Sequence, residues 1–227
     1  MSSGALPART LTERWVYRTV RATARLVAVG CFDLRCFGRE HLDFPGAGLL
    51  LSTHQSTLDP VLIGLMGNTE LAYLARKTLF QSFLFAALIR ALNAIEIDRE
   101  GGGLAGLKET IRRLKQGKKV LIFPEGTRSS TGQPAPLKPG FISLARRGSP
   151  PLVPMAVTGA FQALQRGARL PRYAPLCVFV GPRIEPELVA AMDDQQLLAE
   201  IARRLNACHL EALKHTERAT RLSLAAQ

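Results

Sequence analysis

Short apolar runs that alternate with helical segments constrain this fold more than any other feature of the sequence. Each run has the length and aliphatic content of a buried strand, and amphipathic segments such as 103–117 separate the runs. The predicted strands lie within residues 32–42, 47–53, 70–76, 95–98, 118–124, 151–157 and 176–184. Strands that alternate with helices form a sheet that helices cover on both faces. We therefore predict an α/β fold with a mixed, largely parallel β-sheet flanked by helices on both faces.

The chain is predicted to form one domain that follows an N-terminal helical segment. Its 227 residues suit one domain with a sizeable core, and neither an internal repeat nor a linker divides them. We place the helical segment at 1–32 and the domain at 33–227, which ends in one long helix. The four cysteines are scattered without the spacing of a metal site, so we expect no bound metal.

Residues 11–30 have the amphipathic pattern of a helix that lies in a membrane interface. Apolar residues recur at helical spacing on one side, at Trp15, Val16, Val20, Ala24 and Val27. Arginines form another stripe, at Arg14, Arg18, Arg21 and Arg25. A helix packed on its own domain with a solvated basic side explains the same pattern, and composition does not decide between the two. No segment has the ~20 predominantly apolar residues of a clean spanning helix.

The net charge of +12 favours a polyanionic partner. Nucleic acid, an anionic membrane surface and a phosphorylated substrate all meet that description. The sequence contains no zinc finger and no RNA-binding aromatic signature, and it has only three tyrosines and one tryptophan for stacking on bases. We therefore expect no nucleic-acid partner.

The stretch STHQSTLDP, residues 52–60, places a histidine and an aspartate at the end of a predicted strand. Pro60 suits the first position of a helix and Asp59 its N-cap, so a turn separates His54 from Asp59. Such a turn can return the carboxylate to one imidazole nitrogen and leave the other as a proton acceptor. In the alternative, Asp59 only caps the helix and His54 only bonds loop carbonyls.

A second polar cluster, FPEGTRS at residues 123–129, follows another predicted strand. Gly126 permits a tight turn, Thr127 offers a hydroxyl, and Arg128 offers the planar fork that binds phosphate. Glu125 places an acid beside that arginine, and a local Glu–Arg pair in an ordinary turn is the alternative reading. Ligands in open α/β sheets gather at the carboxyl ends of strands, so the two clusters predict a site there.

The two clusters and two further motifs, in this order, resemble the glycerolipid (lysophospholipid) acyltransferase family over about residues 34–185. The four motifs are THQSTLD, IDR at 97–99, FPEGTRS, and the apolar stretch LVPMAV around a proline. The sequence departs from the family at Thr53, where asparagine is often found. Each motif by itself is weak or moderate, whereas the ordered set is specific.

The resemblance implies an O-acyltransferase that moves a fatty acyl group from acyl-CoA or acyl-carrier protein to the free hydroxyl of 1-acylglycerol-3-phosphate, giving phosphatidic acid. His54, held by Asp59, would take the hydroxyl proton, and that oxygen would attack the thioester directly without an acyl-enzyme. Consistent with this, the sequence contains no G-x-S-x-G nucleophile motif. The substrate-binding residues that the resemblance implies are Lys77, Arg99, Glu125, Gly126, Thr127 and Arg128. Neither a cofactor nor a metal is expected, apart from the thioester co-substrate.

The resemblance also implies that residues 1–32 anchor an acyltransferase domain, 33–227, to an anionic membrane surface. The expected location is the cytoplasmic face of the inner (cell) membrane, with peripheral or monotopic attachment. Three other functions stay open: acyl transfer to another lysolipid such as lyso-ornithine lipid, lipid hydrolysis by a water that His54 activates, and lipid binding without catalysis. The acceptor, the donor, the acyl-chain length and the oligomeric state are not determined by the sequence.

Overall fold

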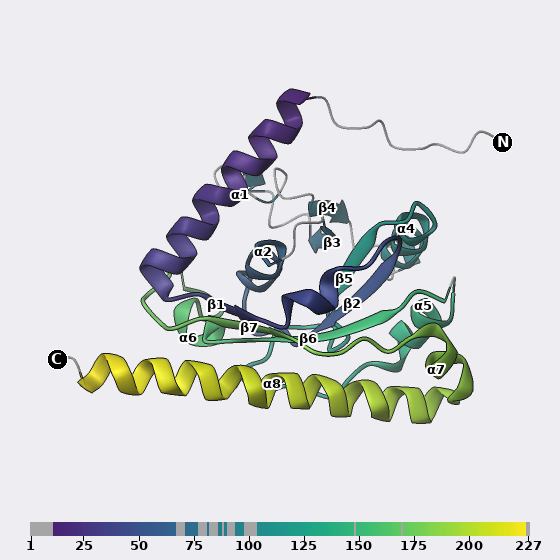
Figure 1. Ribbon diagram of the computed structural model, residues 1–227. Coiled ribbons are helices and arrows are strands. Elements are labelled where there is room, and N and C mark those ends of the chain that lie inside the picture. Colours follow the sequence, from purple (N-terminus) through teal and green to yellow (C-terminus); the bar gives the residue numbers. More distant parts are fainter. Residues whose placement is uncertain are drawn as a thin grey trace.

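The computed structural model describes residues 11–66, 71–76, 81, 86–87, 89, 94–97, 104–147, 149–168 and 170–225 (Figure 1). The helices are α1 (Leu11–Phe32), α2 (Asp59–Gly64), α4 (Leu104–Lys115), α5 (Ile142–Arg146), α6 (Ala160–Ala163), α7 (Pro186–Ala191) and α8 (Asp194–Ala225). Two short 3-10 helices are η1 (Arg39–Leu42) and η3 (Pro139–Phe141). The strands are β1 (Arg35–Phe37), β2 (Gly48–Ser52), β3 (Leu71–Arg76), β4 (Ala94–Ile97), β5 (Lys119–Ile122), β6 (Leu152–Thr158) and β7 (Cys177–Val180).

The described strands form one seven-stranded sheet in the order β1-β7-β6-β2-β5-β3-β4. Neighbouring strands are parallel except β6 and β7, so β1 and β7 run opposite to the other five. This arrangement confirms the predicted mixed, largely parallel sheet. The central strand is β2, with β5 on one side and β6 on the other.

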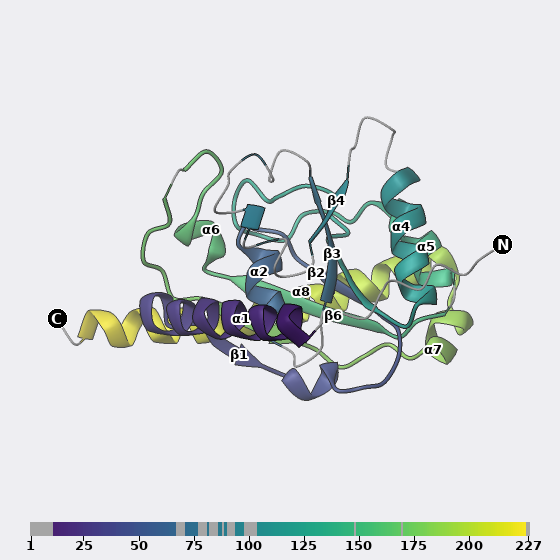
Figure 2. The same cartoon turned by 90° about the horizontal axis from the view of Figure 1, so that it is seen from above.

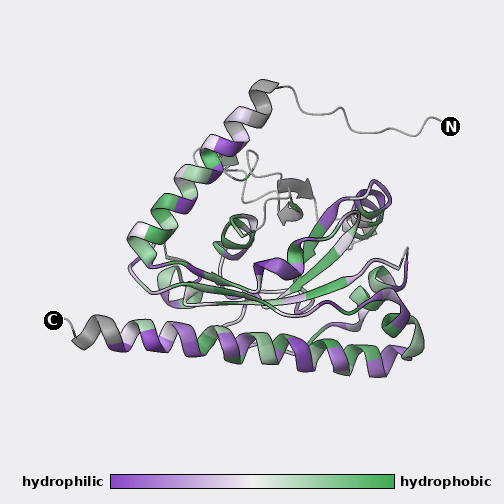
Figure 3. Ribbon diagram, in the orientation of Figure 1, coloured by the Kyte–Doolittle hydropathy of each residue, from purple (hydrophilic) through white to green (hydrophobic). Residues whose placement is uncertain are grey.

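Two hydrophobic cores, one on each face, explain why the strands read as continuous apolar runs. Leu50 joins a core with residues of α1 and α2, whereas Leu49 and Leu51 join a core with residues of α4, α5, α7 and α8. All three leucines are fully buried. A strand that is covered on both faces has no solvent-facing position to fill with a polar residue. Figure 3 shows hydrophobic residues along much of the sheet.

Helix α8 covers one face of the sheet along its length, opposite α1 and α2 (Figures 1 and 2). Its buried residues recur at helical spacing, at Leu197, Ile201, Leu205, Cys208 and Ala212. The hydroxyl of Thr158, at the end of β6, donates to the Ala212 carbonyl at 3.1 Å. The single long C-terminal helix that the sequence predicts is therefore present, and it supports the strands that end at the site described below.

Helix α1 packs against the domain with one side only. Tyr17 and Ala28 are buried against the domain, and Arg21 turns inward with its guanidinium Nη2 donating to the Leu65 carbonyl at 3.4 Å. The predicted stripe grouped Trp15 with Ala24, but Ala24 packs on the core while Trp15 is 67% exposed. Trp15 and Ala24, two residues of the predicted stripe, therefore lie on different sides of the helix.

The outward face of α1 carries its own apolar stripe. Trp15, Leu26 and Val29 are all exposed and stand at spacings that return to one side of a helix. Exposed Arg18 and half-buried Arg25 flank that side. Among the helices that the structure describes, none combines the length and apolarity that crossing a bilayer requires.

Candidate active site

The two polar motifs meet at the carboxyl edge of the sheet because β2 and β5 are parallel neighbours. Leu51 of β2 pairs with Ile122 of β5, so His54 and Glu125, each three residues further along, come to the same level. The His54 backbone N–H donates to Glu125 Oε1 at 3.2 Å. The Ser129 N–H in turn donates to the His54 carbonyl at 2.7 Å. The ladder register therefore positions the FPEGTRS motif directly against the histidine.

Asp59 holds the turn that contains His54. Its Oδ2 lies 2.8 Å from His54 Nδ1 and also accepts the backbone N–H groups of Gln55 at 2.6 Å and Ser56 at 2.8 Å. The predicted N-cap role is wrong, because α2 begins at Asp59 itself and Leu58 occupies the cap. The fully buried carboxylate bonds groups that precede it, which closes the turn and orients the imidazole. The alternative in which Asp59 only caps a helix is therefore removed.

The His54 ring is oriented on two sides and open on a third. It stacks on Phe123 with ring centroids 3.9 Å apart and an interplanar angle of 17°. The side chain is 18% exposed, and its Nε2 makes no hydrogen bond within the described part of the chain. With Nδ1 held by a carboxylate, the tautomer that carries its proton on Nδ1 leaves Nε2 as a proton acceptor. This is the geometry that a general base needs.

Side chains of the same turn tie it to two other segments, the loop after β5 and the segment that contains α6. Gln55 Nε2 donates to the Gly132 carbonyl at 2.5 Å, and its Oε1 accepts the Phe161 N–H at 3.3 Å. The Ser56 hydroxyl donates to the Leu164 carbonyl at 2.9 Å. Both Gln55 and Ser56 are buried, so the turn is held rigidly against the loops that follow β5 and β6.

Thr53, the departure from the family pattern, has a structural partner. Its hydroxyl oxygen accepts the Val157 backbone N–H at 3.3 Å, and its own N–H donates to the Met155 carbonyl at 3.4 Å. The residue is almost completely buried. Thr53 therefore continues the β2–β6 pairing up to the residue before His54.

Gly126 is required by the path of the FPEGTRS loop. Its φ of +72° is left-handed, and a Cβ built there would lie 2.9 Å from Lys138 Cδ and 3.1 Å from Lys138 Nζ. The backbone of this loop is closed by Gly126 N–H to the Phe123 carbonyl and by Lys138 N–H to the Pro124 carbonyl, at 3.0 and 2.9 Å. An exposed lysine side chain thus lies across the motif.

Lys138 is the residue at this site that reading the sequence missed. It stands in residues 129–140, which composition marks only as loop, and nothing in its neighbourhood indicates a fold back onto Gly126. No described carboxylate forms an ion pair with it. Of the residues that were predicted to bind substrate, Thr127 is exposed and Arg128 is partly buried in the same turn. Lys77 and Arg99 lie outside the described residues, so their roles stay predictions.

Glu125 is buried at the base of the site. Burial raises the pKa of this carboxyl to about 7; the backbone N–H groups of His54 and Ala135 act against that rise, and Asp59 adds to it. Its Oε2 has no hydrogen-bond partner among the described residues. A carboxyl that is only about half ionised near pH 7 serves better to fix the His54 backbone by a hydrogen bond than to act as a fixed charge.

The raised pKa of Glu125 predicts a pH-dependent stability. The unfolded carboxyl ionises near 4.5 and the folded one near 7, so the folded state holds more protons between these values and wild type loses stability as the pH rises through them. Glu125→Gln should remove this loss, so the two proteins should diverge in urea midpoint from pH 5 to pH 8. Parallel midpoints across that range would contradict the raised pKa.

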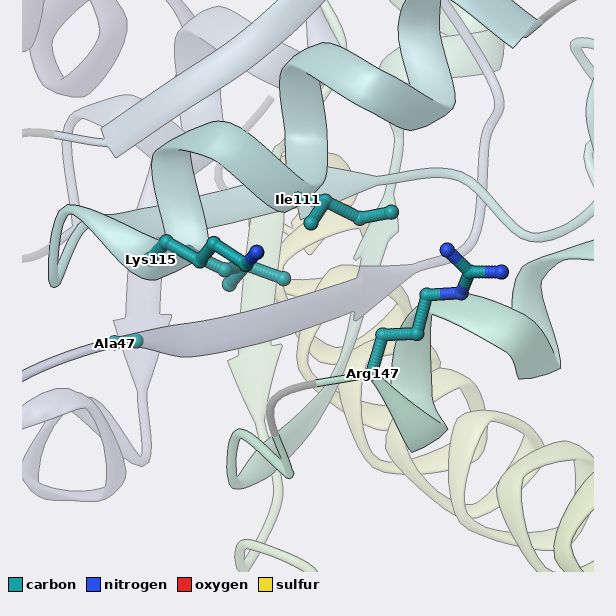
Figure 4. A pocket seen from close by; sticks show the side chains of 5 residues that line it. Ala47, Ile111, Lys115 and Arg147 are labelled. Carbon is teal, nitrogen blue, oxygen red and sulfur yellow. The ribbon is translucent and has the colours of Figure 1, made fainter. Parts of the chain in front are cut away.

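Two hollows in the surface differ in their relation to the site. One, of about 440 Å³, is lined by Ala47, Ile111, Leu114, Lys115 and Arg147 (Figure 4). Ala47 precedes β2, so this hollow lies at the edge of the sheet opposite His54. The other, of about 480 Å³, lies against α8 and includes Gln55, the neighbour of His54, together with Gln133 and His209.

Comparison with known proteins identifies the family. Residues 33–158, which contain both polar motifs, match the Acyltransferase family. The chain belongs to that family. It is an acyltransferase, and the resemblance seen in its motifs is confirmed.

Two curated relatives of this acyltransferase carry the same name. The 1-acyl-sn-glycerol-3-phosphate acyltransferase of Bacillus subtilis is 29% identical over 76% of this chain and 84% of its own length. The protein of the same name from Cocos nucifera is 35% identical over 57% of this chain, and that alignment spans only 43% of the plant protein.

A solved structure supports the fold. The crystal structure of the 1-acyl-sn-glycerophosphate (LPA) acyltransferase, PlsC, from Thermotoga maritima has a TM-score of 0.76 to this acyltransferase. The match covers 93% of this chain and 85% of the other at 21% sequence identity. At that identity the likeness shows the same fold, and it covers almost the whole of the present chain.

Proposed function

We propose that this acyltransferase moves a fatty acyl group from an acyl thioester to the free hydroxyl of 1-acylglycerol-3-phosphate, giving phosphatidic acid. The observation that carries the proposal is His54, with Nδ1 bound to the buried Asp59 carboxylate and Nε2 free among the described residues, set against the FPEGTRS loop. The shared name of relatives from a bacterium and a plant supports this acceptor.

In the proposed reaction His54 acts as the general base. Its Nε2 takes the proton of the acceptor hydroxyl as that oxygen attacks the thioester carbonyl, and Asp59 stabilises the imidazolium that forms. Collapse of the tetrahedral intermediate breaks the C–S bond, and the imidazolium returns the proton to the leaving thiolate. General-base assistance contributes about 10²–10⁴ in rate, and holding both substrates in place supplies much of the rest. The step needs no acyl-enzyme, no cofactor and no metal.

The acceptor phosphate is proposed to bind at the FPEGTRS loop. Arg128 offers a guanidinium fork that can bind phosphate with two hydrogen bonds. The Lys138 ammonium lies over Gly126, which is two residues before Arg128. Thr127 adds an exposed hydroxyl, while buried Glu125 ties the loop to the His54 backbone N–H. The predicted contributions of Lys77 and Arg99 belong to the same anion site.

Replacing Lys138 should weaken acceptor binding. Lys138→Ala is expected to raise the KM for 1-acylglycerol-3-phosphate about tenfold, the size of one charge-assisted hydrogen bond, with little change in the KM for the donor. Lys138→Arg should restore most of the affinity. Lys115→Ala is the matched control, because this exposed lysine lies at the opposite edge of the sheet. An effect on donor KM alone would show that Lys138 serves the thioester instead.

One assay separates the candidate functions. Purified protein is supplied with acyl-CoA or acyl-carrier protein and a panel of lysolipids, and both free thiol and lipid product are followed. Product only with 1-acylglycerol-3-phosphate supports the proposal, whereas product only with lyso-ornithine lipid assigns the other acceptor. Thiol release without any acceptor identifies a hydrolase. No turnover with either donor would reject the enzymatic proposal.

We further propose that α1 holds the protein at a membrane, as a peripheral or monotopic protein on the cytoplasmic face of the cell membrane. The outward stripe of Trp15, Leu26 and Val29 beside Arg18 is the pattern of an interfacial helix. A lipid acceptor resides in the bilayer, so attachment brings the enzyme to its substrate. The boundary of this anchor at residue 32 coincides with the end of α1.

A further inference from the structure

The loop between α6 and β7 exposes apolar side chains. In residues 164–168 and 170–176, here called the α6–β7 loop, Leu170 is 80% exposed and Tyr173 is 60% exposed. Leu170 has the largest exposure among the large apolar side chains that the structure describes as exposed. Single exposed leucines are common on protein surfaces, so exposure by itself says little about this loop. Its attachments and its charge carry the argument.

The two ends of the loop are hydrogen-bonded to the turn that contains His54 and to the end of α1, the proposed membrane helix. At one end, the Leu164 carbonyl accepts the hydroxyl of Ser56, which lies in the turn between His54 and Asp59. At the other end, the Leu176 N–H donates to the carbonyl of Phe32, the last residue of α1, at 3.0 Å. Figures 1 and 2 agree in placing this segment beside that end of α1. The loop therefore bridges the catalytic turn and the interfacial helix.

The charge of the loop matches an anionic surface. Arg166 and Arg172 are exposed, and neither forms an ion pair with a described residue. Arg172 instead donates its Nε to the Gln162 carbonyl at 3.2 Å, which fixes its stem on α6. An aliphatic side chain and a tyrosine beside two arginines are the composition of a segment that sits at headgroup level.

We propose that the α6–β7 loop is a second membrane-contacting surface, which inserts Leu170 and Tyr173 at the bilayer interface while Arg166 and Arg172 face anionic headgroups. The inference rests on the proposed function, since an acceptor held in the bilayer must reach His54 from it. Continuity with the end of α1 favours a bilayer over an acidic carrier protein as the occupant. Contact between this loop and the bilayer places the turn that contains His54 at the membrane surface, because the Ser56–Leu164 hydrogen bond joins that turn to the loop.

The test uses the full chain and vesicles of phosphatidylcholine with or without phosphatidylglycerol. Leu170→Ser/Tyr173→Ser is expected to lower vesicle partitioning about tenfold or more, the loss of roughly one buried apolar side chain. Its activity should fall similarly with acceptor in vesicles and stay unchanged with a monomeric short-chain acceptor. Arg166→Gln/Arg172→Gln should weaken binding only to vesicles that contain phosphatidylglycerol, by about fivefold per arginine.

The matched control is Leu188→Ser/Leu210→Ser, on α7 and α8, where the leucines are 44% and 50% exposed. It should leave partitioning unchanged. The proposal is overturned if the loop variant partitions to vesicles as wild type does. It is also overturned if the variant loses as much activity with the monomeric acceptor as with acceptor in vesicles. A defect confined to carrier-protein donors assigns the loop to an acidic protein instead. Vesicle partitioning is measured without turnover, so it tests the loop even if the wild-type protein transfers no acyl group. An absence of acyl transfer would reject only the proposed function.

Discussion

Replacing His54 with alanine should slow acyl transfer severely while the protein remains folded. The substitution removes the only nitrogen proposed to accept the hydroxyl proton, so kcat should fall by about 10²–10⁴. The fold should tolerate the change because Asp59 Oδ2 retains its two backbone donors, Gln55 and Ser56. Thiol release with saturating donor and acceptor measures the loss, and far-ultraviolet circular dichroism with a thermal melt measures folding.

A second histidine provides the control for His54. His41 in η1 is 33% exposed, and its nearest acidic neighbour is Glu40 at 4.0 Å, so His41→Ala removes an imidazole without touching the turn. This variant should keep wild-type kcat. Near-normal activity of His54→Ala would mean that the general-base assignment is wrong, and an equal loss in both variants would point to misfolding rather than chemistry.

Replacing Asp59 should damage both stability and catalysis. In Asp59→Ala the buried N–H groups of Gln55 and Ser56 lose their acceptor, and each unsatisfied buried donor costs about 1–3 kcal/mol. The free energy of unfolding should therefore fall by roughly 2–5 kcal/mol in urea titrations. The kcat should fall as well, because the imidazole loses the group that orients it and stabilises its charged form.

The asparagine variant separates these two roles. In Asp59→Asn the amide oxygen can still accept the two backbone N–H groups, so most of the stability should return. The negative charge beside the His54 imidazolium is absent, and kcat should stay lower by roughly 10²–10⁴. A variant that recovers both stability and wild-type kcat would show that the Asp59 charge has no part in the reaction.

Local pattern was sufficient for much of the fold. The run around Leu49–Leu51 was predicted as a buried strand because a sheet covered on both faces needs apolar residues at every position. The helix predicted over 103–117 is α4, and its boundaries differ from the prediction by only a few residues. These features depend on neighbours within a few residues, which the sequence displays directly. The spacing of His54, Asp59 and Pro60 similarly predicted a turn that returns a carboxylate to the imidazole.

Long-range pairing decided the rest. The sequence by itself determined the strands, the turn at His54 and the family of the chain, since each depends on short-range spacing. Only the parallel β2–β5 register brings Glu125 against the His54 backbone, and only the resulting burial raises the pKa of Glu125. Lys138 lies against Gly126 because of the path of a loop that has no periodic pattern. The face of α1 that is buried depends on the domain surface against which the helix packs. Periodicity records what lies a few residues away, whereas these contacts join segments whose separation in the chain carries no repeating signal.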